Sequence, residues 1–527
     1  MKSLVVRLVQ QVTWLCQARL ALVDDRKKAL PARRNRIRGP FLAATVFAGT
    51  FLLISSSQIL GQLPFPLLNQ PRRLGRLDSM EQAKRDAEDA YRRGEYTKAV
   101  ELANSVLQVD PTDHVALYLR ASARVELGRT QNDAQLLRDG IADAREAIRL
   151  TQARTASYYL PYIYGMVSLA AVEKHRPHAE VALQVADQVL QNPQLTKEER
   201  ANLLYQRAGV YGYLQRLKDA VRDYEEAIRL QPSHLGAYLA LAEAHASAGE
   251  MGKAEQAFDR AARAFPNSPL VFNNRGMFRQ RRGEPEKAIA DFSRAIELDP
   301  NFAVAYINRG FSLLESGKYE AAENDLTAAI RIDPQQPTAY SLRGTARLCQ
   351  AKLKEAISDY EKVLGLDPNS AVAQADLGFA RFFSGDYQAA VTAFDRALER
   401  DPSAVYLITW RYWAAVRAGR EQEAKAWLQQ HREQVKKSSE WVDHLVAFLT
   451  GEIDQERLLK MAEAAEPGIR PARACEAHYF IGQRHQHAGR SEQAAEHYRQ
   501  ALKTEQRHLS AYRGAKLALG ASGNSTQ

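Results

Sequence analysis

The sequence has few cysteines: only Cys16, Cys349 and Cys475 occur in 527 residues. Their wide, irregular spacing matches neither a disulfide framework nor the paired ligands of a structural zinc site. We therefore expect no role for disulfide bonds in the folding of this chain.

Motifs that carry catalysis are also missing. There is no glycine-rich phosphate loop, no nucleophile elbow and no HExxH pair. One cluster near the carboxy terminus contains metal-ligating residue types: Cys475, His478, His485, His487 and His497. On a helix, His485 and His487 would point to different sides, and His478 occupies a position where a core aromatic residue belongs. The sequence therefore predicts no enzyme, no cofactor and no metal site.

An excess of basic residues is confined to the amino-terminal part of the chain. The formal net charge is +10, but residues 1–78 hold 13 of the 72 Lys and Arg residues and 3 of the 62 Asp and Glu residues. The remaining chain has 59 of each and is neutral. A nucleic-acid-binding domain concentrates basic charge on its binding surface, so we predict no nucleic-acid partner.

The only long apolar run is at residues 41–61. It is uncharged and about 21 residues long, so a helix there would extend roughly 30 Å, enough to span a bilayer core. Arg33, Arg34, Arg36 and Arg38 precede it. By the positive-inside rule, this predicts a single-pass protein of the cytoplasmic (inner) membrane, with its amino terminus in the cytoplasm. The competing interpretation is a cleaved signal peptide, although no small-x-small cleavage site is evident.

Residues at a fixed 34-residue spacing define the rest of the chain. Alanine recurs at Ala220, Ala254, Ala288, Ala322, Ala356, Ala390 and Ala424, and proline recurs from Pro232 to Pro402 at the same step. A bulky residue follows each alanine by four positions, as at Phe292, and a small residue precedes it by twelve, as at Gly276. This pattern resembles the tetratricopeptide repeat (TPR). It implies an all-α fold, a right-handed superhelical solenoid of about ten TPR helical hairpins.

Charged residues follow the same period. Arginine precedes the small residue in four repeats, and those same repeats carry aspartate before the bulky residue. We predict a structural salt bridge within each of these hairpins, pairing Arg207 with Asp223, Arg275 with Asp291, Arg309 with Asp325, and Arg343 with Asp359.

Charge, hydropathy and the 34-residue period together predict the boundaries of the segments. We expect a basic segment at 1–40, which could form an amphipathic helix, a transmembrane helix at 41–61 and a Pro-rich linker at 62–78. Divergent repeats would cover 79–200, regular repeats 201–430 and a helical non-repeat segment 431–474. A terminal TPR-like hairpin at 475–519 and a disordered tail at 520–527 would complete the chain.

Apolar residues on the first helices of several repeats predict a binding surface. Repeat solenoids bind partners on the concave face, and an aromatic-rich groove suits an amphipathic helix or an extended apolar peptide. Alternatively, several of these residues pack against the next hairpin. Phe382 and Phe383 are adjacent and can hardly both be buried on one face. The predicted groove residues are Ile307, Phe311, Leu314, Phe379, Phe382, Phe383, Tyr406 and Trp413.

The carboxy-terminal part carries a second resemblance. The segments EWVDHLVAFLTGEID and CEAHYFIGQ, together with Tyr498 and Tyr512, resemble the end of NlpI-type bacterial TPR lipoproteins, over about the last 120 residues. The resemblance implies a periplasmic adaptor of the cell envelope. The residues before Cys16 lack the small residues of a lipobox, so the helix at 41–61 would serve as the anchor.

The sequence therefore predicts a membrane-anchored scaffold or adaptor that binds proteins or peptides outside the cytoplasm. One alternative is a membrane-bound receptor or complex-assembly factor whose repeats face the cytoplasm. Another is the regulatory arm of an enzyme whose catalytic subunit is a separate chain. Self-association through the repeats is also compatible with the pattern.

Overall fold

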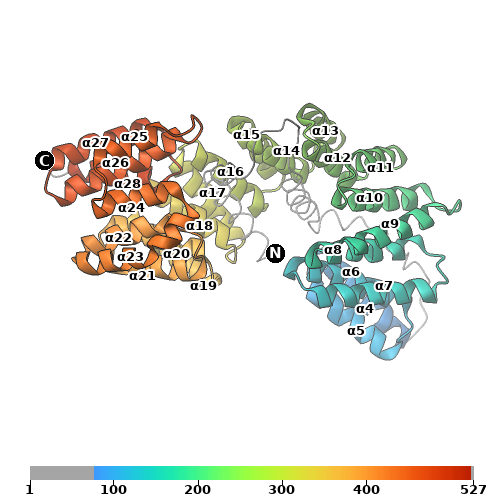
Figure 1. Ribbon diagram of the computed structural model, residues 1–527. Helices are drawn as coiled ribbons and strands as arrows, with labels where there is room; N and C mark the ends of the chain where they lie inside the picture. The colour runs from blue at the N-terminus through green and yellow to red at the C-terminus, as the bar shows by residue number, and fades with distance from the viewer. Residues whose placement is uncertain (1–75, 524–527) are drawn as a thin grey trace, which may run out of the picture. The chain divides into compact units, whose positions relative to one another are not determined.

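The computed structural model describes residues 76–523, which contain 25 α-helices, α4 to α28, and one short 3-10 helix, η1 (Ala156–Tyr158). Within each of its two compact units, the helices pair into hairpins that stack in chain order (Figure 1). The described chain divides within α14 into two compact units, residues 76–275 (unit 1) and residues 276–523 (unit 2). The fold is therefore an all-α solenoid of helical repeats.

Unit 1 contains the first five hairpins and the start of the sixth. Their bounds are α4 (Arg76–Arg92), α5 (Tyr96–Val109), α6 (His114–Gln131), α7 (Ala134–Leu150), α8 (Tyr159–Glu173), α9 (Arg176–Leu190), α10 (Lys197–Tyr213), α11 (Leu217–Leu230), α12 (Leu235–Ser247), α13 (Met251–Ala264) and the first part of α14 (Pro269–Arg281).

Unit 2 contains the rest of α14, the hairpins that follow and a final unpaired helix. Its helices are α15 (Pro285–Leu298), α16 (Ala303–Glu315), α17 (Tyr319–Ile332), α18 (Pro337–Cys349), α19 (Leu353–Leu366), α20 (Ala371–Ser384), α21 (Tyr387–Arg400), α22 (Leu407–Arg417), α23 (Glu421–Ser438), α24 (Glu440–Thr450), α25 (Gln455–Glu463), α26 (Arg470–His487), α27 (Ser491–Lys503) and α28 (Ser510–Gly523).

The prediction of a single-pass inner-membrane protein is corrected. Within residues 76–523, every helix is too short or too polar to cross a bilayer. The segment at 41–61 on which that prediction depended lies outside the described residues, as do the basic segment at 1–40 and most of the linker at 62–78. Most of the described helices instead combine buried with exposed polar positions, because they pack against neighbours on one side and meet water on the other. Only α12 and α22 among them are buried along nearly their whole length. We therefore describe the fold without a membrane helix.

Four regular hairpins of unit 2 close through contact between a glycine and a bulky side chain. A Cβ atom added to Gly378 would lie 2.6 Å from the Phe394 ring, and one added to Gly344 would lie 2.9 Å from the Tyr360 ring. Gly276 and Phe292 make the same contact. The small residue of the repeat is thus required because a ring from the second helix packs directly over the backbone of the first.

The turn inside each hairpin needs a left-handed residue. Gly249, Gly283 and Gly317 supply it, with φ between 74° and 76°. At the equivalent position of the next hairpin, however, the residue is Ala351 with φ 63°. A left-handed conformation costs an alanine about 1–2 kcal/mol, so this turn is held in place by the packing of its two helices.

The segment at 431–474, predicted as helical non-repeat, is occupied by the end of α23 and by α24 and α25. The terminal hairpin predicted from residue 475 begins earlier, at Arg470, and is followed by α28. The predicted tail at 520–527 overlaps α28 up to Gly523, and residues 524–527 lie outside the described residues. Helices α20 to α28 share one continuous hydrophobic core.

Candidate protein-binding surface

Arginine side chains link the two helices of a hairpin. Arg343 donates from Nε and Nη2 to the two carboxylate oxygens of Asp359, at 3.0 and 2.7 Å. Arg309 forms the same paired contact with Asp325, and Arg207 forms it with Asp223. The fourth expected pair, Arg275 with Asp291, has its members on opposite sides of the division between the units and stays a prediction. The paired geometry fits a guanidinium fork to a carboxylate, which makes the contact directional.

A further donor of these arginines, Nη1, contacts the preceding hairpin. Arg343 Nη1 lies 3.3 Å from Thr327 Oγ1, Arg309 Nη1 lies 2.9 Å from Ser293 Oγ, and Arg275 Nη1 lies 2.9 Å from Asp259 Oδ1. Each acceptor lies 16 residues before its arginine. These contacts join successive hairpins, and the sequence analysis missed them although the constant spacing carries the signal.

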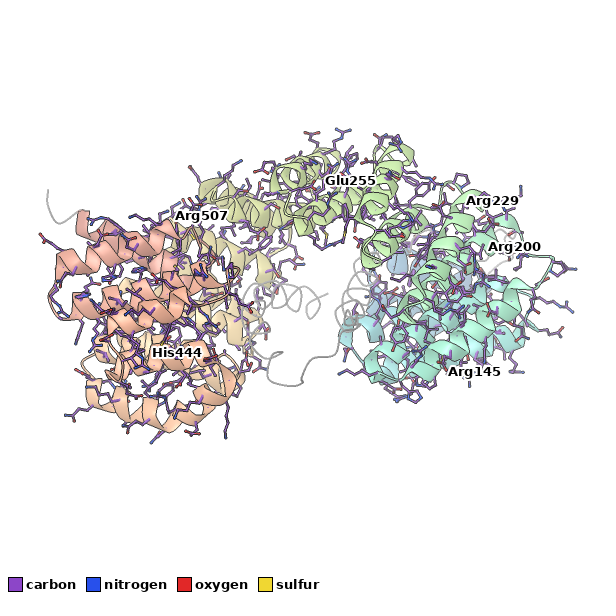
Figure 2. All side chains as sticks on the ribbon, turned by 45° about the horizontal axis from the view of Figure 1, so that its top comes forward. Arg145, Arg200, Arg229, Glu255, His444 and Arg507 are labelled. Atoms are coloured by element: carbon purple, nitrogen blue, oxygen red, sulfur yellow. The ribbon has the colours of Figure 1, made fainter. Side chains whose placement is uncertain are left out.

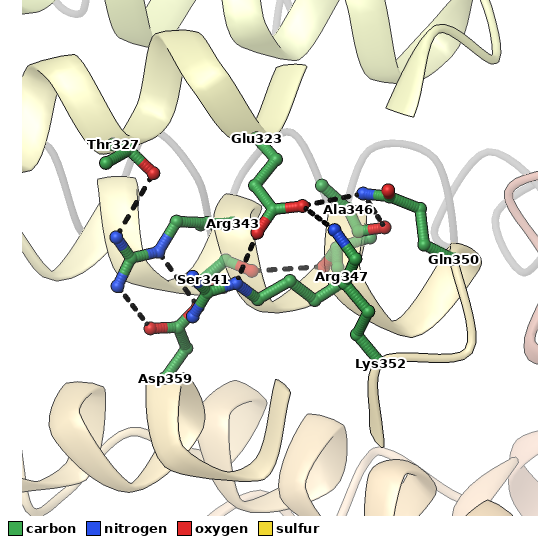
Figure 3. Close-up of polar contacts among 10 residues, drawn as sticks. Glu323, Thr327, Ser341, Arg343, Ala346, Arg347, Gln350, Lys352 and Asp359 are labelled. Carbon is green, nitrogen blue, oxygen red and sulfur yellow. Dashed lines mark hydrogen bonds and ion pairs between the residues drawn. The ribbon is translucent and has the colours of Figure 1, made fainter. Parts of the chain in front are cut away.

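A second set of charges surrounds the Arg343 contact in unit 2. Figure 3 shows Arg347 donating to both Asp359 and Glu323, while Lys352 also approaches Glu323 at 2.8 Å. Burial raises the pKa of Glu323, but the bonds from Lys352, Arg347 and Gln350 outweigh it and lower that pKa to about 2. Glu323 is therefore ionised at neutral pH and acts as a structural counter-ion.

Other ion pairs differ from these contacts because their side chains are exposed to water. Arg229, labelled in Figure 2, pairs with Glu226 one turn away on α11, and the two side chains are 68% and 39% exposed. Water screens such a pair, so it adds little to stability. This pair is a matched control for the buried contacts of Arg343.

The eight predicted groove residues lie on α16, α20 and α22, except Tyr406, which directly precedes α22. Ile307, Phe379, Phe382 and Trp413 are buried. Phe311, Leu314, Phe383 and Tyr406 are partly buried. The alternative considered from the sequence, packing within the chain, thus describes the first four residues.

Trp410, which the sequence analysis did not single out, lies at the centre of the aromatic residues. Its ring centroid is 5.5 Å from that of Phe382 and 5.8 Å from that of Phe383, both edge-on. Tyr479 of α26 stacks on it at 4.9 Å, and Phe480 approaches at 5.5 Å. The adjacent phenylalanines thus contact the same indole ring, with Phe382 buried and Phe383 partly buried.

One apolar residue on the side of the first helices where the groove was predicted, called the inner side below, remains exposed. Val304 on α16 is 43% exposed. It lies three residues before Ile307 and seven before Phe311, so the helical period puts the three on one face of α16. Val304 is thus the exposed residue of this face, and Phe311 and Leu314 near it are partly buried.

Three of the histidines considered as metal ligands, His478, His485 and His497, form a compact group in the last hairpin. His478 Nδ1 lies 3.0 Å from His497 Nδ1, and the His485 ring stacks on His497 at 5.4 Å. Burial, together with the neighbouring His478 and His485, lowers the pKa of His497 to about 4. Among residues 76–523, no three His, Cys, Asp or Glu side chains are placed to hold a metal ion. These histidines are therefore neutral packing residues near pH 7.

A carboxyl group on the first helix of this hairpin, that of Glu476 on α26, is largely shielded from water. Trp441 Nε1 donates to Glu476 Oε2 at 2.7 Å. Burial raises the pKa of Glu476 to about 7, although the Trp441 hydrogen bond and Arg473 act in the opposite direction. In the unfolded chain this carboxyl would ionise near its usual value of about 4.5.

We predict that Glu476→Gln stabilises the protein at pH 8 and leaves it unchanged at pH 4. Because the folded pKa is raised, the unfolded state loses its proton first, and stability falls as pH rises from about 4.5 through about 7. Glutamine keeps an acceptor for Trp441 and cannot ionise, so the gain at pH 8 should be on the order of 2 kcal/mol. Urea unfolding at the two pH values measures it. The exposed Glu492→Gln is the control, and an equal change in both variants would contradict the prediction.

Comparisons with known proteins agree with the repeat. Tetratricopeptide-repeat family models match residues 205–269, 269–302, 292–324 and 350–411. The chain therefore contains tetratricopeptide repeats and has the architecture of a TPR protein. None of these four matches extends past Arg411, and the NlpI-type relationship of the last 120 residues is not shown. No curated protein matches the chain.

Several solved structures are similar to parts of the chain. MamA (residues 41 to the end) from Desulfovibrio magneticus RS-1 is 25% identical, covering 32% of this chain and 96% of that one, with a TM-score of 0.31. PilW, a type IV pilus biogenesis factor, is 24% identical over 38% of this chain and 94% of its own, with a TM-score of 0.35. The first TPR of Spaghetti (RPAP3), bound to an HSP90 peptide, is 32% identical over 22% of this chain and 94% of its own, with a TM-score of 0.22. At these scores the neighbours indicate nothing about what this chain binds.

Proposed function

We propose that the protein is a non-catalytic scaffold that binds helical segments of other proteins on the inner side of its stacked hairpins. One observation carries the proposal: in unit 2, the side of α20 that bears Phe379 and Phe383 already receives a helix, α28 of the same chain. A surface that accepts one helix through aromatic contacts has the shape and chemistry to accept another. The proposal includes neither a membrane anchor nor a location in the cell envelope.

The exposed Val304 on α16 offers a place for first contact with a partner. Val304 is among the few large hydrophobic residues that the described chain exposes, and it continues the face that carries Ile307 and Phe311. Partner anchors concentrate where apolar side chains can lose water on binding. We therefore expect a partner helix to contact α16 at Val304.

Affinity capture with the full chain tests this proposal. The wild-type chain, Val304→Asp and Val181→Asp are immobilised, and partners captured from a lysate of the source cells are quantified by mass spectrometry. Val304 is near the amino terminus of α16, where an aspartate does not disturb the helix. Val181 on α9 is an exposed valine of similar accessibility, 39% against 43%.

We expect Val304→Asp to lower the recovery of specific partners at least fivefold and Val181→Asp to leave it unchanged. Circular dichroism of the three proteins should be the same, because both positions are exposed. Equal recovery by Val304→Asp and the wild-type chain would remove the inner side of unit 2 as the binding surface. No specific partner for any of the three proteins would contradict the scaffold function.

A further inference from the structure

Helix α28 lies between the last hairpin and the inner side of the earlier repeats of unit 2. It follows α27 after a turn at Glu505, which has φ 55°. Ala511 and Ala515 on one face are buried in the core shared with α26. Residues on other faces of α28 contact α17, α18 and α20, which are more than 100 residues earlier in the chain.

The first of these contacts is aromatic and needs a glycine. A Cβ atom added to Gly514 would lie 2.8 Å from Phe383 Cε1 and 2.7 Å from Tyr479 Cε2. The backbone of α28 therefore lies directly against the Phe383 ring. Phe383 is one of the predicted partner-binding residues, and here the chain itself covers it.

Cationic side chains make the second group of contacts. Lys516 Nζ lies 5.2 Å from the centre of the Tyr319 ring, a cation–π contact. Arg507, labelled in Figure 2, extends to Gly317, where its Nη1 lies 2.7 Å from the place that a Cβ atom would take. Arg507 and Lys516 are both exposed to solvent.

Arg513 extends the charge contacts towards α18 and α20. It is near Asp376, whose pKa burial raises to about 6 while Arg513 lowers it. Burial likewise raises the pKa of the Cys349 thiol, and Arg513 and Lys516 act against that rise. A basic helix thus faces a carboxylate, a thiol and a tyrosine ring, which is a complementary arrangement of charge.

Features of α28 itself favour its release. Gly514 and Gly520 lie inside the helix, and each glycine lowers helix stability by about 1 kcal/mol relative to alanine. An added Cβ at Gly520 would meet nothing within 4 Å. The Nε atom of Arg513 is buried without a hydrogen-bond partner in the described chain, which costs free energy while α28 stays docked. Terminal helices of this kind open locally at a low free-energy cost.

We propose that α28 is a displaceable internal ligand of unit 2, and that a partner helix with the same pattern binds in its place. That pattern is a small residue facing Phe383, with lysine and arginine side chains directed at Tyr319 and Asp376. The inference rests on the scaffold function proposed above and adds the class of partner, a basic amphipathic helix. It also adds a regulation, because the docked α28 keeps the surface closed until it is displaced.

A labelled peptide of residues 505–523 tests the inference in trans. Its affinity is measured by fluorescence anisotropy against the full wild-type chain, the variant Arg507→Glu/Lys516→Glu and the control Arg499→Glu/Lys503→Glu. Both variants reverse two exposed charges, but only the first weakens the docked α28. Hydrogen exchange of the α28 amides is measured in the same three proteins.

We expect the peptide to bind Arg507→Glu/Lys516→Glu at least tenfold more tightly than the wild-type chain or the control, since the internal copy competes less well. Its α28 amides should also exchange at least tenfold faster. A peptide carrying the same two reversals should not bind. Equal affinities for all three proteins, or α28 amides protected as well as those of α26 in both variants, would make α28 a fixed part of the fold and overturn the inference.

The two proposals fail in different ways. If α28 stays fixed but Val304→Asp still lowers partner recovery, the scaffold function holds and the displacement is wrong. If the peptide displaces α28 but Val304→Asp changes nothing, the surface recognises the chain's own helix, and the scaffold function loses its support.

Discussion

Replacing Trp410 by alanine is expected to lower the free energy of unfolding of unit 2 by about 3–5 kcal/mol. The indole is buried and contacts Phe379, Phe382 and Phe383 on α20, together with Tyr479 and Phe480 on α26. Its removal leaves a cavity between these two helices, and the surrounding rings cannot close it without leaving their own contacts.

Urea unfolding followed by circular dichroism measures this loss, and hydrogen exchange localises it. Protection should fall in α20, α22, α26 and α28 and stay unchanged in unit 1. The control is Trp427→Ala, because that partly exposed ring stacks on His431 at 3.9 Å and faces Arg411 at 4.3 Å without entering the aromatic cluster. We expect the control to cost about 1 kcal/mol. Similar losses in the two variants would show that Trp410 is not central to the core.

Replacing Arg343 by methionine should also destabilise unit 2, by about 2–3 kcal/mol. Asp359 is buried, and the two side chains are 4% and 13% exposed. Removing the arginine takes two hydrogen bonds from a carboxylate that water cannot reach, and Arg347 alone remains to neutralise it. Breaking one side of a buried ion pair is costly for this reason.

A double variant separates the cost of leaving the buried carboxylate unpaired from the net contribution of the ion pair. Arg343→Met/Asp359→Leu removes both charges, so its stability should return to within about 1 kcal/mol of the wild-type chain. The exposed control, Arg229→Met, should change stability by less than about 0.5 kcal/mol. Urea unfolding of the four proteins gives the comparison. A loss of the same size at Arg229 and Arg343 would mean that burial does not set the strength of these ion pairs.

Much of the repeat was predictable because its contacts are local in sequence. The 34-residue spacing places Gly344 against Tyr360 and Arg343 beside Asp359, only 16 residues apart along the chain. Such positions belong to one hairpin, and a hairpin of fixed length brings them together wherever it occurs in the chain. The same period carried the contacts to the preceding hairpin, such as Arg343 with Thr327, although they were not recognised.

Contacts between distant parts of the chain were not predictable in this way. Phe382 and Phe383 were expected to leave one ring free, because a single helix cannot bury two adjacent residues on one face. The structure packs both rings against Trp410, and Gly514, from a helix more than 100 residues later, lies directly against Phe383. The left-handed Ala351 was likewise hidden, because alanine gives no sign of a turn that only its surroundings stabilise.

The sequence by itself determined the helical hairpin, its 34-residue period, and the glycine, aromatic and charged residues that close each unit of the repeat. It also determined the neutrality of the repeat region and the lack of recognisable catalytic motifs. Only the tertiary structure decided which of the predicted binding residues are covered and that α28 covers Phe383. The physical reason is distance: the period fixes contacts within a hairpin and between neighbours, whereas the meeting of α28 with α20 depends on how many hairpins stack between them.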